Sequence, residues 1–426
     1  MIPMRRFPVL ILGLTAYLLA ACAPETGPGG GTTIHFYQFS LPGFHETFAP
    51  LIERFEREHA PYRVEIHPLP ANTDDQHQFY ITHLAESQTS RIDVLALDVI
   101  WMAEFARAGL LLPLGDLLPE EDWGRMFPAI RSAAFYDHRP YGVPYFIDGG
   151  LLYSRADLLR RHGYSAPPRT WPELIRMAST VLQREDDPLL RGFVWQGRQY
   201  EGLVCNFIEY LPGPLVFSGE ESLEAGASWL RTVDFMRGLI HRHRVSPRAV
   251  LAMAEEDARQ TFQNGRALFM RNWPYAWRLL QQEGSPVAGK IWASPLPGWG
   301  PDQPGHGALG GFLLGVSRHS AVPQGARLWV RFLSRPRTQR YLARRLGLTP
   351  PRSDLLPEGG DETRLPPELL EAVMRSTVPR PVTPLYIPLS QSLQAALSGA
   401  LAGVYTPREA WRLFQTDYRR LSRILS

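Results

Sequence analysis

The chain has 426 residues, a formal net charge of +3 and only two cysteines, Cys22 and Cys205. Its 45 basic and 42 acidic residues are interspersed, which excludes the basic stripe typical of a nucleic-acid-binding surface. The part after residue 31, about 395 residues, is long enough for two domains and has no uncharged segment long enough to span a membrane. Lysine occurs once, at Lys290, and proline 39 times, which fits either a hot environment or a GC-rich genome.

The first 22 residues have the pattern of an export signal. Arg5 and Arg6 precede an apolar run over 7–21, which is shorter than the roughly 20 residues of a spanning helix. The run ends in Leu-Ala-Ala-Cys22, which resembles the bacterial lipobox, whose cysteine is acylated and becomes the new N-terminus. Residues 23–31 are rich in Gly and Pro and predict a flexible tether. We therefore expect a domain anchored by lipid to the outer face of the cytoplasmic membrane; an ordinary cleaved signal is the alternative. Cys205 is then unpaired, and we expect it to be a buried small hydrophobe.

The periodicity of apolar residues predicts alternating strands and helices. The strands are expected at 33–39, 62–68, 93–97, 151–154, 267–271 and 312–317. The helices are expected at 48–59, 76–87, 102–108, 155–162, 171–183, 321–334, 366–376 and 407–425. Thr170 is expected to cap the helix that starts at 171. This alternation predicts an α/β fold with a parallel sheet flanked by helices in each of two lobes, and a ligand cleft between them.

Two acids occupy positions typical of ligand groups. Asp98 follows the strand at 93–97, so it is either a ligand group at the carboxyl end of that strand or a helix N-cap. Asp148 precedes two glycines and is either a ligand group or a turn residue.

An aromatic cluster lies at 271–277 (RNWPYAW), after the strand at 267–271. An indole at a strand–helix junction can lie flat against a sugar ring. We expect Trp273 and Tyr275 to face a ligand and Trp277 to lie in the core.

Two further segments are candidates for the same surface. Gly310 and Gly311 allow backbone N–H groups to approach a ligand closely, and Phe312 beside them can stack on it. Arg380 is held between two prolines, in an extended and rigid setting that favours a functional role.

The sequence has no motif of a known hydrolase, zinc protease, redox or phosphate-binding site, so we expect no enzyme activity, no cofactor and no metal site. The histidines of the first lobe show no metal-ligand spacing with neighbouring carboxylates and are interpreted as surface residues: His35, His45, His59, His67, His77 and His83.

Five segments together resemble the extracellular sugar-binding lipoproteins of ABC importers, in particular the trehalose/maltose-binding branch. They are LDVIW at 97–101, IDGGLLY at 147–153, VWQGRQYEGLVC at 194–205, RNWPYAW at 271–277 and VPRP at 378–381. The resemblance implies a two-lobed periplasmic-binding-protein-like fold that closes on a disaccharide and delivers it to permease subunits. It implies lobe 1 from 32–145 plus about 292–345, lobe 2 from 146–291 plus about 346–426, and a monomer.

The resemblance also implies a set of sugar-binding residues. They are Glu46, His77, Asp98, Trp101, Phe146, Asp148, Trp273, Tyr275, the Gly310–Gly311 backbone, Phe312 and Arg380. This chain has Phe312 where the family commonly has Trp, and His77 where the family has an arginine; both changes remove sugar contacts and leave the disaccharide open. A lipid-anchored glycosidase that uses Asp98 and Asp148 as a catalytic pair, or a glucan-docking protein, are the alternatives.

Overall fold

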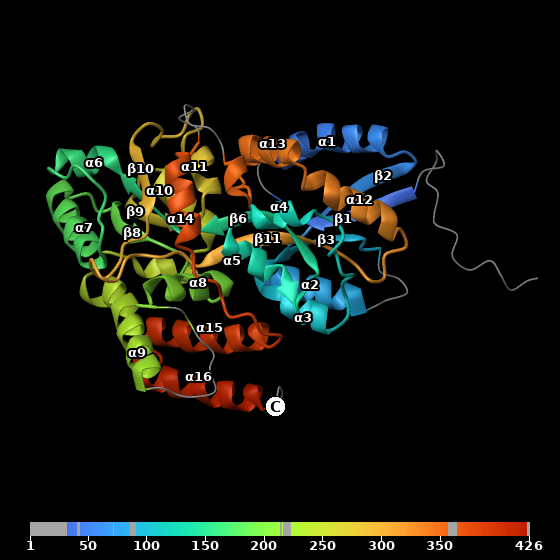
Figure 1. Cartoon of the computed structure of the whole chain (residues 1–426). Helices are drawn as coiled ribbons and strands as arrows, with labels where there is room; N and C mark the ends of the chain where they lie inside the picture. Colours follow the sequence, from blue (N-terminus) through green and yellow to red (C-terminus); the bar gives the residue numbers. More distant parts are fainter. Residues whose placement is uncertain are drawn as a thin grey trace, which may run out of the picture.

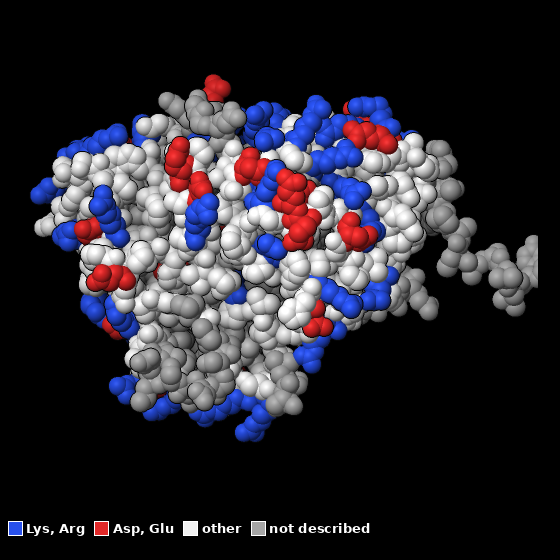
Figure 2. Space-filling view, in the orientation of Figure 1, with Lys and Arg blue, Asp and Glu red and all other residues white. Residues whose placement is uncertain are grey.

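The computed structural model describes residues 32–40, 43–70, 72–85, 91–213, 215, 223–356 and 364–423. Cys22, the expected signal and the tether lie outside these ranges. Within the described ranges, no helix combines the length and the apolar character that crossing a membrane requires. Basic and acidic side chains are interspersed over the face in Figure 2.

The first lobe is built on a five-stranded sheet in the order β2-β1-β3-β11-β6. Its strands are β1 (Thr32–Gln38), β2 (Tyr62–Pro68), β3 (Val94–Asp98), β6 (Gly142–Gly149) and β11 (Leu309–Val316). β1 pairs in parallel with β2 and β3, but β11 is antiparallel to both β3 and β6. The sheet is therefore mixed, not parallel as expected, because β11 enters from the other lobe and not through a helical crossover within this sheet.

Helices cover both faces of this sheet, with α1, α12 and α13 on one side and α2 and α3 on the other (Figure 1). The helices are α1 (Phe44–Glu58), α2 (Thr73–Ala85), α3 (Met102–Arg107), α4 (Glu120–Gly124), α5 (Pro128–Ala133), α12 (Pro323–Leu333) and α13 (Pro336–Leu346). A small hairpin is formed by β4 (Phe135–Tyr136) and β5 (Arg139–Pro140). Phe48, Leu51 and Phe55 form the apolar stripe of α1 and pack in a core cluster with Trp329 of α12.

The second lobe has a four-stranded mixed sheet in the order β10-β7-β9-β8. Its strands are β7 (Leu151–Arg155), β8 (Arg191–Val194), β9 (Ala267–Asn272) and β10 (Ile291–Pro295). Its helices are α6 (Ala156–Arg161), α7 (Trp171–Glu185), α8 (Glu201–Tyr210), α9 (Leu223–Arg237), α10 (Glu255–Gln263), α11 (Tyr275–Leu280), α15 (Tyr386–Ala402) and α16 (Pro407–Ser422). α14 (Pro367–Arg375) contacts strands of both sheets. Short turns are η1 (Val99–Trp101), the π-helical η2 (Gly238–Arg242), η3 (Arg248–Ala252) and η4 (Ser353–Leu355).

Strand pairing places two crossovers between the lobes a few residues later than the expected boundaries. β6 belongs to the first sheet as far as Gly149, and β10 belongs to the second sheet as far as Pro295. The chain therefore enters the second lobe at the Gly149–Gly150 step and leaves it after Pro295. The remaining division of the chain between the lobes stays a prediction.

Two local expectations are confirmed in the second lobe. Thr170 caps α7, because its Oγ1 accepts a hydrogen bond from the Glu173 backbone N–H at 3.3 Å. Cys205 lies in the core on α8, 2% exposed, and burial raises the pKa of its thiol.

Candidate functional site

The first candidate group, the carboxylate of Asp98, lies at the carboxyl end of β3 and is 6% exposed. Its Oδ1 accepts hydrogen bonds from the Ile100 backbone N–H at 3.2 Å and from Arg380 Nη2 at 2.8 Å. Burial raises the pKa of Asp98, and the charge of Arg380 opposes this rise. Asp98 is thus a cap of η1, as one alternative predicted. In the described chain, its Oδ2 forms no hydrogen bond.

Arg380 connects three elements around this carboxylate. Its Nε donates to the Leu309 carbonyl oxygen at 3.2 Å and its Nη1 donates to Glu201 Oε1 at 2.9 Å. The residue is 5% exposed, and its segment is fixed by a hydrogen bond of 2.8 Å from the Leu309 N–H to the Val378 carbonyl. Burial alone would lower the pKa of Arg380, but the charges around it, Asp98 foremost, raise it, so the guanidinium is charged. Arg380 therefore joins the first lobe to the second by two ion pairs.

Glu201 is a member of this network that the sequence prediction missed. It lies at the start of α8, 3% exposed, and accepts hydrogen bonds from Tyr386 Oη at 2.6 Å and from Ser390 Oγ. The sequence held a signal for it, because Glu201 starts a mostly apolar segment. In the structure that segment is α8, and its ten residues are all buried. Buried acids need such partners, so Glu201 fixes the position of Arg380.

Asp148 lies near Asp98 in an environment of a different kind. It is on β6, opposite Gly310 of β11, and is half-buried. Burial raises the pKa of Asp148 to about 8; Arg271 opposes this shift and Asp98 adds to it. Within the described residues, its carboxyl forms no hydrogen bond or ion pair. Asp148 therefore offers its hydrogen-bonding capacity to a molecule other than this chain.

The indole of Trp273 lies against Gly310 and beside Asp148. A Cβ atom placed on Gly310 would be 3.1 Å from Trp273 Cζ3 and 3.2 Å from Asp148 Cβ. The structure thus brings together three of the residues that the sequence predicted for one site.

The half-buried indole is held from several sides. The Arg271 guanidinium lies 3.8 Å from the ring centroid, and the indole N–H donates to Glu255 Oε1 at 3.3 Å. Arg271 is itself fixed by a buried ion pair with Glu209 of α8, whose Oε2 accepts from Nε at 2.7 Å. Arg271 belongs to the same predicted segment as the tryptophan, but the sequence prediction missed Glu209 and Glu255, which come from other segments of the chain.

Tyr275 and Trp277 lie on α11, which begins two residues after Trp273. Tyr275 is half-buried and its hydroxyl donates to Glu256 Oε1 at 2.7 Å. Trp277 packs, partly buried, against the core cluster that contains Leu280. The expected core position of Trp277 is confirmed, and the role of Tyr275 stays a prediction.

Aromatic rings of the first lobe cluster around Phe312. Its ring stacks on that of Phe146, with centroids 5.3 Å apart and 17° between planes, and it lies 4.8 Å from Phe39. Phe312 is half-buried, Phe146 is 4% exposed and Trp101 is fully buried. In this conformation Trp101 presents no face to a ligand and packs edge-on to Phe312 at 6.4 Å. Phe39, at the end of β1, is an aromatic residue that the sequence prediction missed.

The Gly310–Gly311 pair has a packing reason. Gly311 has a φ of +119°, and a Cβ there would lie 2.4 Å from the Phe146 carbonyl oxygen. Together with the tight space at Gly310, this requires two glycines at the site whatever the ligand. The expected approach of their N–H groups to a ligand stays a prediction.

Glu46 and His77 lie apart from the contacts described above. Glu46 is exposed in the first turn of α1 and takes part in no ion pair or hydrogen bond of the described chain. His77 is buried, which corrects its interpretation as a surface residue; its Nε2 lies 2.8 Å from Glu104 Oε2 and its ring packs against Trp101. Neither is joined to Asp98, Asp148 or Trp273 by a described contact.

Comparison with known proteins places this geometry in a family. The profile of the bacterial extracellular solute-binding proteins matches residues 41–340. A probable ABC transporter-binding protein of Deinococcus radiodurans is 33% identical over 355 residues, which cover 82% of this chain and 83% of that protein.

Solved structures agree with the fold. The maltose-bound MalE3 of T. maritima is 36% identical, with a TM-score of 0.81, over 91% of this chain and 99% of that one. The GacH receptor of Streptomyces glaucescens, at 21% identity and a TM-score of 0.78, covers 92% of this chain and 98% of its own. The predicted two-lobed α/β fold is confirmed, as is the prediction of a binding protein and not an enzyme. The chain belongs to the family of bacterial extracellular solute-binding proteins.

Proposed function

We propose that this protein captures a disaccharide such as maltose or trehalose between its two lobes and delivers it to the permease of an ABC importer. Family membership and the likeness to a maltose-bound relative support sugar as the class of ligand. We further propose that it acts as a monomer held to the outer face of the cytoplasmic membrane through an acylated Cys22.

The observation that carries the proposal is the unpartnered carboxyl of Asp148 beside Trp273 and Gly310. A sugar presents hydroxyl donors at its rim and C–H groups on its faces. A carboxylate can accept two hydroxyl protons, and an indole covers the apolar face of the ring. One residue of each kind, both close to the position that a side chain at Gly310 would occupy, suits such a ligand.

Asp98 and Arg380 would form the second polar half of the site. Asp98 Oδ1 is taken up by Ile100 and Arg380, so Oδ2 is the oxygen that a sugar hydroxyl would use. Because Arg380 also contacts Glu201, it contacts residues of both lobes at the point where closure brings them together. We propose that Tyr275, Phe312 and the Gly310–Gly311 backbone complete the contacts with the sugar. Phe146 and Trp101 pack against the ring of Phe312 and hold it in position.

Calorimetric titration with maltose, trehalose, sucrose and glucose tests the proposal. At pH 9, above the Asp148 pKa of about 8, the carboxyl is ionised, and we expect one disaccharide to bind there with a stoichiometry of one. Asp148→Asn should weaken this binding by about tenfold or more, since bonds to charged acceptors contribute about 1.5–3 kcal/mol. Asp302→Asn, in an exposed loop, is the matched control. Binding of the preferred sugar that is equal in the two variants would place the site elsewhere.

A further inference from the structure

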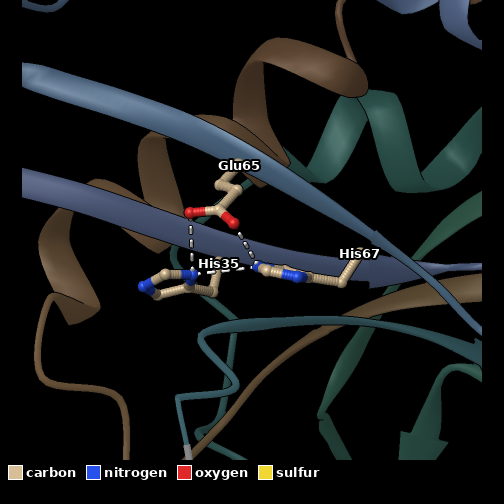
Figure 3. A group of neighbouring side chains, drawn as sticks. All are labelled: His35, Glu65 and His67. Carbon is tan, nitrogen blue, oxygen red and sulfur yellow. Dashed lines mark hydrogen bonds and ion pairs between the residues drawn. The ribbon is translucent and has the colours of Figure 1, made fainter.

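Three side chains from the edge strand β2 and its neighbour β1 in the first sheet converge outside the interlobe site (Figure 3). His35 lies on β1, and Glu65 and His67 lie on β2; the parallel register pairs His35 with Glu65, and Tyr37 with His67. Alternate residues of a strand share a face, so all four side chains lie on one face of the sheet. The His35 carbonyl accepts a hydrogen bond from the Asp93 N–H, at the opposite end of β3 from Asp98.

The spacing of the ligand atoms fits one bound ion. His35 Nδ1 lies 3.0 Å from His67 Nε2, and the two Glu65 oxygens lie 3.7 Å from His35 Nδ1 and 3.6 Å from His67 Nε2. The two imidazole nitrogens lie at hydrogen-bond distance, but the two carboxylate distances are too long for hydrogen bonds, so hydrogen bonding alone does not explain the position of Glu65. Donor atoms around a tetrahedral ion at about 2.1 Å lie about 3.4 Å apart, within the range of these three distances.

The surroundings hold the two imidazoles in place. The His67 ring stacks on Tyr37, with centroids 4.5 Å apart and 18° between planes. The His35 backbone N–H donates to Asp93 Oδ2 at 2.8 Å, which fixes β1 at this point. The imidazole side chains are 17% and 25% exposed, whereas the Glu65 side chain is 59% exposed and leaves the group open to solvent on one side.

We propose that His35 Nδ1, His67 Nε2 and the Glu65 carboxylate bind one divalent transition-metal ion, with Zn²⁺ the best match. Two imidazoles and a carboxylate, with water as a fourth ligand, are a common zinc donor set, whereas Mg²⁺ and Ca²⁺ prefer oxygen donors alone. Among the described residues, this is the group of three or more His, Cys, Asp and Glu side chains whose ligand atoms all lie within 4.8 Å of one another. The sequence prediction found no metal spacing here because 32 residues separate the histidines in the chain and only strand pairing joins them. A bound ion would cross-link β1 to the edge strand β2.

Titration of the chelator-treated, full-length protein with ZnCl₂ tests this proposal. We expect one ion per chain, a rise in Tm on binding, and no comparable effect of MgCl₂. His35→Gln and His67→Gln should each lower zinc affinity by about tenfold or more, because each removes one of three protein ligands. Glu65→Gln should lower it less, because an amide oxygen remains.

His45→Gln, an exposed histidine on α1, is the matched control and should bind zinc as the unmodified protein does. Circular dichroism and Tm without metal establish whether the variants fold. This check is needed because both target histidines are half-buried and their substitution could disturb the sheet. Zinc binding that survives both His35→Gln and His67→Gln, or no binding at equimolar zinc, would overturn the proposal. An anomalous zinc peak between these three side chains in a crystal would support it.

Discussion

Asp98 and Asp148 both belong to the candidate site, yet their surroundings differ. Asp98 is paired with Arg380, whereas Asp148 has no hydrogen-bond partner among the described residues and its pKa is raised to about 8. A carboxyl whose pKa is higher in the folded than in the unfolded state stabilises the fold, and this contribution is fully present at a pH below the unfolded-state pKa of about 4. That contribution is lost as the pH rises through about 8, because ionisation then takes place in a half-buried position.

Asp148→Asn should therefore remove a pH-dependent cost of ionisation. At pH 4 we expect the variant and the unmodified protein to have nearly the same Tm. At pH 9 the variant should have the higher Tm, because its free energy of unfolding is larger by about 2 kcal/mol. Thermal unfolding of both proteins without sugar, across this range, measures the effect. Asp302→Asn should show no such divergence, and equal divergence in both variants would contradict the assignment.

Substitutions of Trp273 and Trp277 distinguish a ring that stacks on a ligand from a ring that packs in the core. Trp273→Ala removes a half-buried ring beside Asp148, and we expect sugar affinity to fall by about 2–4 kcal/mol, the range of aromatic anchors at binding sites. Because stacking tolerates many hydroxyl patterns, all sugars of the panel should weaken alike. Trp277→Ala should lower Tm and leave sugar affinity nearly unchanged. The interpretation fails if the two variants have the same effects in calorimetry and thermal unfolding.

At the scale of elements, the sequence prediction succeeded where one face of an element is buried. α1 and α7 have apolar residues three and four positions apart, and β1 and β2 have clear strand patterns. α15 was missed because its seventeen residues include no charged side chain, so its exposed face lacks the polar contrast that defines the helical period. β6 was missed because it contains Pro144 and is buried on both faces, so that its residues do not alternate.

The site was predictable in part for a related reason. Asp98, Asp148, Trp273 and Arg380 follow strands or lie in rigid segments, and these local signals are visible in the chain. Glu201, Glu209 and Glu255 belong to the site only through tertiary contacts with Arg380, Arg271 and Trp273. Their function depends on which elements pack together, and local patterns do not specify that.

The buried ion pair between Glu209 of α8 and Arg271 of β9 gives a prediction at this scale. Glu209→Gln leaves the Arg271 guanidinium without its ionic partner, and we expect a loss of about 3 kcal/mol in free energy of unfolding. Denaturant unfolding measures it. Asp234→Asn, which breaks an exposed pair with Arg242, should change stability little. Equal small losses in both variants would show that the buried pair does not hold these elements together.

At the scale of the whole molecule, the proposed lipid anchor gives a prediction about where the protein is found. Cys22→Ser should prevent acylation and release the protein from membranes, because the apolar run before it is too short to span a bilayer. Membrane fractionation measures the release, and calorimetry should show unchanged sugar affinity. A Cys22→Ser protein that stays in the membrane fraction would contradict the proposed lipid anchor.

Closure of the two lobes on a sugar is the central claim. Contacts that exist only in the closed state shift the population toward it, and Arg380 already joins Asp98 of the first lobe to Glu201 of the second. The most direct measurement is a crystal structure of the protein grown with the sugar that binds most tightly in the calorimetric panel. We predict one sugar between the lobes, with a ring against Trp273 and hydroxyl groups within hydrogen-bond distance of the Asp148 and Asp98 carboxylates. Density for the sugar at a place that touches none of these three residues would contradict the account.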